Sequence, residues 1–527
     1  MRFRKFLSVI LILSLSATFF ACQPSSSGDS TVNSVTLDTE ATEEKSIDTD
    51  NESNAAVESK PIDTDETETV TEETEYVEKE AFEDFVSFAD TASNSTTKKE
   101  LRKNGSYAVS FTVPEGYMTS LALNLWDSAK PVETQLVIRI YKFDGNYETS
   151  VEGRALRTEY VESIMRTYTM WFGKEKMPAG DYLAVVSSTA TEQAESIKVG
   201  TLWLPNTLPA EYEPYNLVNY VDGKPSKKGN ALYGGFTYVH DVPVKEVEPL
   251  SGDPCTEGKA KVIVIGGQSN AVGSTNVSFL INNIGKEKYD EYSKGIDNVK
   301  ILYRCTTTSN TDLANSAYSE DFVPVKPGQG ISAGKFGPEL GLAVYLNEHY
   351  PDETFYIIKH AIGGASMAGY WNLNDETRQK GLALLKDTID DGLALLKEDG
   401  LEPEILAFFW MQGESDGGSF PGAYKYYELQ TKLAEHLRET YADFAAPRGI
   451  AFIDGAASDS GYWNCYMAVN YSKRLFRRDS LLNYYIDTNA MGLTTLYENN
   501  DPAHYDSMSM MHLGELVGEC LTEILTP

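Results

Sequence analysis

The chain of 527 residues has little positive charge, histidine or cysteine. Its 45 Lys and Arg residues are outnumbered by 78 Asp and Glu residues. This balance argues against a nucleic-acid partner, because nucleic acid binds a basic surface. The six His and five Cys residues show no zinc-like spacing, and no Gly-rich loop precedes a Lys-Ser or Lys-Thr pair. We therefore expect no metal, no nucleotide and no other cofactor.

Long hydrophobic runs are also scarce, and none beyond the first 22 residues is long enough to span a bilayer. A basic start, 1–5, precedes an apolar run of 15 residues, 6–20, and then Cys22. Segment 1–22 resembles a bacterial lipoprotein signal, in which an acylated Cys22 begins the mature protein. An ordinary secretory signal is the alternative. Both predict export, and the first predicts an extracellular protein anchored to the bacterial membrane by lipid.

Much of the acidity lies in segment 23–84, which is rich in Ser, Thr, Asp and Glu. Residues 29–84 alone contain 20 acidic residues and three lysines. Such a segment cannot bury enough apolar surface to offset its chain entropy. We therefore expect a disordered, self-repelling linker. Because the linker carries so much of the charge, the net charge says little about the substrate.

Residues 85–248 change in character, with short apolar or alternating segments separated by turns. Segments of this kind occur at 110–113, 121–125, 134–141 and 182–187. The pattern predicts a β-sandwich domain, similar to a jelly roll. Its aromatic residues leave two interpretations open, namely core packing and glycan binding by stacking on sugar rings. These aromatic residues are Tyr117, Trp126, Tyr168, Trp171, Phe172 and Trp203.

A short linker, 249–259, leads into a second domain, 260–527, in which apolar runs alternate with segments of helical periodicity. Strands are expected at 260–266, 353–359, 404–410 and 448–454, and helices at 337–350, 375–398, 422–442 and 507–525. This alternation predicts an α/β fold with a parallel sheet covered on both sides. Stretches 274–330 and 455–500 show little regular pattern and are expected to form the rim of a pocket.

The apolar run 262–265 ends at two glycines and is followed by Ser269. Branched residues that stop at glycine predict a buried strand ending in a tight turn. Ser269 would then lie at the carboxyl edge of the sheet, where open α/β folds build their sites. Unpaired amides of a helix beginning there could stabilise an oxyanion. Ser269 is thus a candidate nucleophile, although serine in such a turn is more often a helix cap.

Two further polar motifs follow in the chain. Asp501 precedes His504 by three residues, on a loop before an expected helix. A carboxylate in this position can orient the imidazole, which can then deprotonate a serine. The motif Gln412-Gly413-Glu414 follows the apolar run 405–409. Three polar motifs at strand ends predict one shared site rather than core packing.

These motifs resemble the sialate O-acetylesterase-type branch of the SGNH hydrolases. That branch is related to the acetyl xylan esterases of carbohydrate esterase family six. The resemblance covers roughly residues 260–525 and implies a three-layer α/β/α domain of the SGNH-hydrolase type. The matching segments are 267–273, 336–339, 359–366 with Trp371, 410–416, and 501–504 with Leu513 and Gly514.

The resemblance also implies roles for single residues. Ser269 would be the nucleophile, His504 the general base and then the general acid, and Asp501 the residue that holds His504. An oxyanion hole would use the Ser269 amide, an amide from Gly363 or Gly364, and the side chain of Gln412. Four more residues, Gln268, Asn270, Glu414 and Asp416, are expected to brace the loops. For the two acids, Glu414 and Asp416, a part in the chemistry is the alternative.

The function implied is removal of acetyl esters from glycans, with sialic acid, xylan and other sugars left open as substrates. The partner would be an acetylated carbohydrate. A surface glycan-binding protein with a degenerate hydrolase domain is the alternative from another class. A lipase or thioesterase of the same superfamily is a third hypothesis, and the Gly-Gln-Ser-Asn and Trp-x-Gln-Gly-Glu patterns favour sugar esters over it.

The remaining cysteines and histidines carry little information. No spacing selects a disulfide pairing among Cys255, Cys305, Cys465 and Cys520. Cys520 lies among apolar residues and is expected to be a buried thiol. His360 is expected to be structural, and His512 to lie on the surface of the last helix or to be partly packed.

Overall fold

The computed structural model describes residues 78–526, apart from 89–95, 102–103, 128–135, 162–166, 174–175, 189–196, 203–209, 227–230, 312–316, 419, 496–497 and 499–500. The expected signal segment with Cys22 and most of the expected linker lie outside these residues. So do Trp203 and the side chain of Trp126. Within the described residues, no helix is both long and apolar enough to cross a bilayer.

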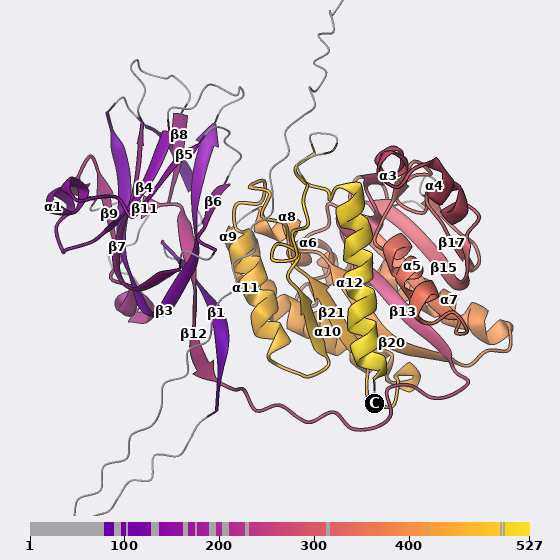
Figure 1. The fold of residues 1–527 in the computed structure, drawn as a ribbon. Coiled ribbons are helices and arrows are strands. Elements are labelled where there is room, and N and C mark those ends of the chain that lie inside the picture. The colour runs from indigo at the N-terminus through magenta and orange to yellow at the C-terminus, as the bar shows by residue number, and fades with distance from the viewer. Residues whose placement is uncertain are drawn as a thin grey trace, which may run out of the picture. The chain divides into compact units, whose positions relative to one another are not determined.

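The first part of the structure is built from antiparallel strands (Figure 1). The main hydrogen-bonded path runs β1-β12-β3-β7-β4-β5, and β3 also pairs with β6, β8 and β9. Two short helices, α1 (Tyr147–Glu152) and the 3-10 helix η1 (Ala210–Tyr215), join the strands. The strands are β1 (Lys79–Ser87), β2 (Thr96–Glu100), β3 (Ser106–Asp127), β4 (Leu136–Lys142), β5 (Arg157–Val161), β6 (Thr167–Trp171), β7 (Met177–Ser188), β8 (Ile197–Leu202), β9 (Val218–Val221), β10 (Lys224–Pro225), β11 (Ala231–Leu232) and β12 (Gly234–Pro243).

Two boundaries in this part differ from those expected from the sequence. Strand β1 begins at Lys79, inside the expected linker 23–84. The surrounding acidic residues mask its apolar positions, Phe82 and Val86. Val86 is buried in the core of this part, and Phe82 is buried against Tyr471 of α11. The expected segments 110–113 and 121–125 belong to one 22-residue strand, β3, rather than to two. The pairing of β3 with β7 shifts register between Val113 and Tyr117, which marks a bulge within this long strand.

The second part is an α/β domain with a mainly parallel sheet. Strands β15, β19, β13, β20, β21 and β22 lie side by side in this order and all run parallel. The expected strands 260–266, 353–359 and 404–410 are confirmed within a few residues, and 448–454 begins later. The strands are β13 (Ala260–Gly267), β14 (Thr275–Asn276), β15 (Ile296–Thr307), β16 (Ala317–Tyr318), β17 (Val323–Val325), β18 (Lys335–Phe336), β19 (Phe355–Gly363), β20 (Pro403–Met411), β21 (Ala451–Gly455) and β22 (Asn483–Ile486).

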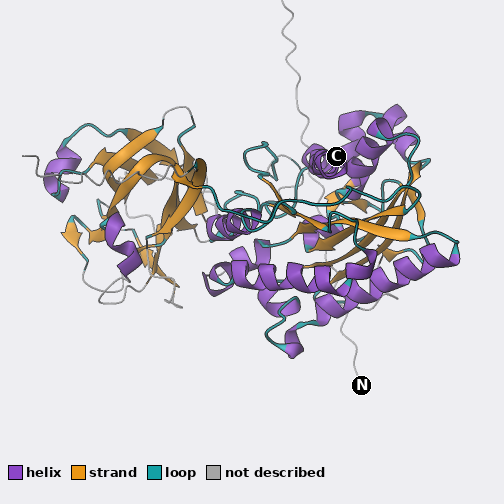
Figure 2. Cartoon of the chain, turned by 90° about the horizontal axis from the view of Figure 1, so that it is seen from below, coloured by secondary structure: helices purple, strands orange, loops and turns teal. Residues whose placement is uncertain are grey.

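Helices cover both faces of this sheet (Figure 2). Along β13, Ile263 and Ile265 pack with α2, α3, α5 and α12, whereas Val262 and Val264 pack with α7, α10 and α11. Successive side chains of a strand point to opposite faces, so a continuous apolar run supplies both cores. The helices are α2 (Ser269–Val272), α3 (Val277–Ile284), α4 (Lys286–Tyr292), α5 (Glu339–His349), α6 (Met367–Tyr370), α7 (Lys380–Glu398), α8 (Glu414–Gly417), α9 (Phe420–Tyr424), α10 (Tyr426–Thr440), α11 (Tyr466–Arg477) and α12 (Ser507–Leu525).

The stretches with little regular pattern, 274–330 and 455–500, nevertheless form helices and strands, which is a correction. Strand β15 lies within 274–330, and α11 and β22 lie within 455–500. Polar residues at buried or half-buried positions obscure the apolar patterns of β15 and α11 in the sequence. In α11, Lys473 lies on the buried face because it pairs with Asp454 of β21 at 2.5 Å. Helix α7 begins at Lys380 rather than 375, because Asp375 caps a separate short turn by accepting from the amide of Thr377.

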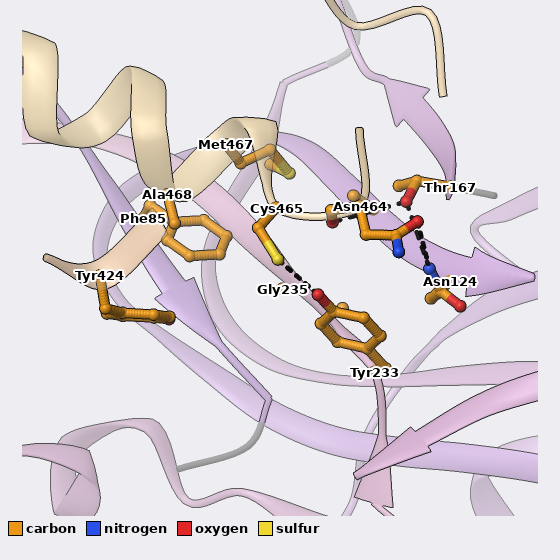
Figure 3. Close-up of a pocket in the computed structure, with 12 residues that line it drawn as sticks. Phe85, Asn124, Thr167, Tyr233, Gly235, Tyr424, Asn464, Cys465, Met467 and Ala468 are labelled. Carbon is orange, nitrogen blue, oxygen red and sulfur yellow. Dashed lines mark hydrogen bonds between the residues drawn. The ribbon is translucent and has the colours of Figure 1, made fainter. Parts of the chain in front are cut away.

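The antiparallel part contacts the α/β domain directly, and residues 75–527 form one compact unit. Arg478, which directly follows α11, donates to Glu80 of β1 at 2.8 Å. The hydroxyl of Tyr233 contacts the thiol of Cys465, and Asn124 donates to Asn464 at 3.0 Å (Figure 3). The four cysteines of the described part are unpaired. Cys520 is only partly buried, and it packs against the core cluster that includes the buried face of α12.

Helices α5 and α12 approach closely through two glycines. A Cβ at Gly514 would overlap the carbonyl oxygen of Pro338, and one at Gly341 would overlap that of Met511. We expect Gly514→Ala to lower the free energy of unfolding by about 3 kcal/mol, the upper range for overpacking a core. Urea denaturation measures this change. Gly334→Ala is the control, because open space surrounds that position. Equal stability of the two variants would contradict the prediction.

Candidate active site

Ser269 is the first residue of α2 and is separated from the end of β13 by Gln268 alone. The turn requires glycine at 267, where φ is +133° and a Cβ would overlap the carbonyl oxygen of Met411 in β20. The amide of Gln268 donates to the same oxygen at 2.9 Å. Strand β13 lies between β19 and β20, where the strand order changes direction along the chain. Ser269 therefore lies at the switch point of the sheet, where open α/β folds bind ligands.

His504 and Asp501 form a hydrogen-bonded pair on the loop before α12. Nδ1 of His504 lies 2.6 Å from Oδ2 of Asp501, and the amide of Ala503 donates to Oδ1 at 3.0 Å. The bond from His504 lowers the pKa of Asp501 below its usual value. An ionised Asp501 accepts from Nδ1–H, which leaves the lone pair of the neutral imidazole on Nε2. This is the tautomer that a general base needs.

Asn270 connects the serine turn to the histidine loop. Its Nδ2 donates to the carbonyl of Ala503 at 3.3 Å, and its Oδ1 accepts from the amide of Tyr505, also at 3.3 Å. These are the two residues on either side of His504. Asn270 itself follows Ser269, so one buried side chain fixes the histidine backbone relative to the serine.

The serine and histidine are therefore brought together, although no hydrogen bond joins Ser269 Oγ to His504 within the described residues. Such bonds are often long in ligand-free hydrolases and tighten in the complex with substrate. Ser269 is half-buried, and the side chain of His504 is 26% exposed. Both groups can therefore meet a substrate from solvent.

Two buried carboxylates lie behind the site, at the end of β20. Glu414 accepts from Nδ2 of Asn270 at 2.7 Å. Asp416 accepts from the amides of Met367 and Ala368 at 2.7 and 3.2 Å. Burial raises the pKa of Glu414 and of Asp416, and these hydrogen bonds oppose the effect. Both acids thus make the loop-bracing contacts expected of them.

Gln412 is completely buried in the same cluster. Its Nε2 lies 2.7 Å from Oδ2 of Asp416, 3.1 Å from the carbonyl of Ala365 and 3.2 Å from Oε1 of Gln268. Gln268 also accepts from the amide of Ser415 at 3.1 Å. The amide protons of Gln412 are therefore directed at acceptors of the protein. Its part in an oxyanion hole stays a prediction.

The two candidate glycines differ in backbone position. Gly363 is the last residue of β19 and pairs with Thr307 of β15. Gly364 lies beyond the strand with φ +79°, and its amide donates no hydrogen bond within the described residues. A free amide at the carboxyl edge is the kind of donor that stabilises an oxyanion. The geometry therefore favours Gly364 over Gly363.

Lys473 is a buried residue near the site that the sequence did not predict. Nζ of Lys473 in α11 lies 2.5 Å from Oδ1 of Asp454 and donates to the carbonyl of Gly455 at 2.9 Å. Its charge also favours the ionised form of Glu414. No local signal marks Lys473, because its partners are distant in sequence. His360, by contrast, is buried beside Thr388, and burial lowers its pKa to about 3, so it stays neutral.

A serine at the switch point of a parallel sheet, beside a histidine held by a carboxylate, is the arrangement of an ester hydrolase. The model of the family "Carbohydrate esterase, sialic acid-specific acetylesterase" matches residues 259–523, and the chain belongs to this family. The protein is therefore an acetylesterase of the carbohydrate esterase class. A comparison with curated proteins gives no match.

Several solved structures share similarity with the chain. A protein from Arabidopsis thaliana is 16% identical, with 51% of this chain and 100% of that one covered and a TM-score of 0.36. NanS is 15% identical, with coverages of 50% and 97% and a TM-score of 0.37. The acetyl xylan esterase Est2A from Butyrivibrio proteoclasticus is 12% identical, with coverages of 84% and 98% and a TM-score of 0.27.

We expect Asn270→Ala to lower kcat by about 100-fold with little change in KM, because small displacements of catalytic groups have effects of this size. The variant loses the bonds on both sides of His504 and the donor to Glu414. Steady-state kinetics with 4-nitrophenyl acetate measures the effect. Asn374→Ala, which truncates an exposed asparagine away from the site, is the control. An unchanged kcat in Asn270→Ala would show that His504 is positioned by other contacts.

Proposed function

We propose that the protein is a cell-surface carbohydrate O-acetylesterase that removes acetyl esters from glycans through an acetyl-Ser269 intermediate. The observation that carries the proposal is the His504–Asp501 pair, with 2.6 Å between Nδ1 and Oδ2, tied to the Ser269 turn by Asn270. This arrangement supplies a nucleophile, a base of the right tautomer and a means of holding them together.

In the first half of the reaction, Ser269 Oγ attacks the acetyl carbonyl carbon while Nε2 of His504 takes the serine proton. The tetrahedral intermediate collapses, the sugar oxygen leaves with the proton from His504, and acetyl-Ser269 remains. In the second half, His504 deprotonates a water molecule, which attacks the acetyl carbon. Acetate leaves and Ser269 recovers its proton from His504.

We assign the oxyanion hole to the amides of Ser269 and Gly364, each expected to lower the barrier by about 3 kcal/mol. Gln412 is the third candidate, and it requires rotation away from Asp416 to donate to the oxyanion. In its present contacts it holds the 365–368 loop, and with that loop the Gly364 amide, against β20. Gln412 thus supports the hole even before any rotation.

For the rest of the chain we propose the organisation expected from its sequence. Cys22 carries a lipid anchor after removal of 1–21, and the acidic segment that follows acts as a tether outside the membrane. The antiparallel part is an accessory domain of the jelly-roll class and the α/β domain an SGNH hydrolase. Such a tether would let the enzyme reach glycans beyond the membrane surface.

We expect Ser269→Ala to abolish acetate release while the protein keeps its fold, because no other hydroxyl can replace the nucleophile. Acetate is measured with O-acetylated sialic acid, acetylated xylan, acetylated mannan and 4-nitrophenyl acetate. Circular dichroism checks the fold, and Ser332→Ala, at an exposed serine, is the matched control. If Ser269→Ala released acetate as fast as the parent protein, the mechanism would be refuted. No acetate from any substrate would favour a glycan-binding protein instead.

Removal of the base should lower kcat more than loss of its orientation does. We expect His504→Ala to lower kcat by about 10⁶-fold and Asp501→Asn by about 10⁴-fold. An asparagine amide donates to Nδ1 and so moves the imidazole proton to Nε2, whereas the base itself remains. The kcat values of the two variants are compared in steady-state assays with 4-nitrophenyl acetate. A larger loss in Asp501→Asn than in His504→Ala would contradict the assigned roles.

A further inference from the structure

A cleft of about 370 Å³ lies between β6 of the antiparallel part and the loops that follow β21 and β22. It is separate from the contacts of Ser269 and His504. The side chains that line it include the aromatic Trp171, Tyr466 and Tyr485 and the charged Glu83, Asp459, Arg474 and Asp487. None of these residues takes part in the proposed reaction.

Trp171 presents a large ring to solvent in a fixed orientation. The side chain is 46% exposed, and Nε1 donates to Oδ2 of Asp459 at 3.0 Å. The hydrogen bond holds the polar edge of the indole, so the ring stays aligned with the cleft. An immobilised, exposed tryptophan is suited to stacking on a flat apolar surface such as the face of a sugar ring.

Carboxylate acceptors stand around the ring. Within the described residues, Oδ1 of Asp459 and Oδ2 of Asp487 accept no hydrogen bond from another residue. The loop of Asp459 is held by its amide, which donates to Oδ1 of Asn489 at 3.0 Å. Fixed carboxylate oxygens are strong acceptors for hydroxyl groups. A stacking ring with hydroxyl acceptors beside it is a combination that recognises carbohydrate.

The charge of the cleft selects between classes of carbohydrate. The only cation among its lining residues is Arg474, whose Nη1 lies 3.3 Å from Oε2 of Glu83 and whose Nε donates to the Glu83 carbonyl at 3.1 Å. Three carboxylates, Glu83, Asp459 and Asp487, line the cleft against this one cation, and Arg474 interacts with both Glu83 and Asp487. Three negative charges and one positive charge leave a net formal charge of −2. These carboxylates repel an anionic sugar such as sialic acid. They accept hydrogen bonds from a neutral one.

The cleft lies at the same edge of the sheet as Ser269. Asp459 follows the carboxyl end of β21, which is two strands from β13, or about 10 Å at the usual spacing. Tyr505, the neighbour of His504, donates from its hydroxyl to the carbonyl of Ala456 at 3.3 Å. The loop that carries Asp459 is thus attached to the histidine loop, and one short oligosaccharide can reach both sites.

We propose that this cleft binds a neutral oligosaccharide, with Trp171 stacked on a sugar ring remote from the acetylated one and Asp459 and Asp487 accepting its hydroxyl hydrogens. The inference deepens the proposed function and rests on it for the identity of the reacting sugar. It makes an acetylated neutral polysaccharide the substrate class and disfavours sialylated chains.

The test is calorimetric titration of the Ser269→Ala protein with xylohexaose, mannohexaose, cellohexaose and the anionic sialyllactose. We expect at least one neutral hexaose to bind and sialyllactose not to bind. Trp171→Ala in the same background should weaken binding by about tenfold, the size of one aromatic stacking interaction. Trp171→Phe should retain most of the affinity, because it keeps a ring and loses only the bond to Asp459.

The control is Tyr160→Ala, which removes an aromatic side chain of β5 that is 66% exposed and does not line the cleft. The proposal is overturned if no neutral hexaose binds or if sialyllactose binds as tightly. It is also overturned if Trp171→Phe loses as much affinity as Trp171→Ala, because the residue would then serve only the contact with Asp459.

Kinetics of the otherwise unmodified enzyme separate this proposal from the function it rests on. Two values of kcat/KM are compared, one for the chemically acetylated form of the hexaose that binds and one for 4-nitrophenyl acetate. Trp171→Ala should lower the ratio of the first value to the second by about tenfold. Tyr160→Ala should leave the ratio unchanged. Binding that depends on Trp171 without acetate release would support the cleft and refute the esterase. Acetate release with an unchanged ratio would keep the esterase and refute the cleft.

Discussion

The site depends on the need to satisfy two carboxylates that are buried at the end of β20. Glu414 and Asp416 are almost fully excluded from solvent, and a buried carboxylate without partners is very costly. Their donors are Asn270 beside Ser269 and the amides of 367–368, which come from distant segments, and the neighbouring Gln412. Satisfying the acids therefore fixes the serine turn and the glycine loop against one strand end. The chemistry is carried out by other residues on a scaffold that these bonds make rigid.

The parallel sheet supplies the second constraint. Because β13 lies between β19 and β20, the loops that leave the carboxyl ends of all three strands converge near Ser269. The histidine reaches this edge from α12, which packs on α5 through Gly341 and Gly514. The close approach of these helices sets the position of the loop before α12. Gly341, which is distant from His504 in the sequence, thus helps to set the position of His504.

The sequence predicted the elements whose patterns are undisturbed. The apolar run of β13 and the periodic helix α12 lie within a few residues of their expected bounds. Strand β15 and helix α11 were not predicted, because half-buried polar residues interrupt the apolar pattern of β15 and polar residues occupy buried positions in α11. Lys473 is the plainest case, since its burial requires Asp454. Strand β1 was likewise taken for linker because acidic residues surround its few apolar ones.

By itself, the sequence determined the class of enzyme, because the candidate nucleophile, base and orienting acid are residue types in local motifs at strand ends. The pairing of Asp501 with His504 also follows from a spacing of three residues. Only the tertiary structure decided how the motifs meet, through Asn270 and the buried acids, and which glycine amide is free. The cleft of Trp171 and Asp459 likewise has no local signal. Its side chains lie 288 positions apart in the chain and come together only when β6 packs beside the loop after β21.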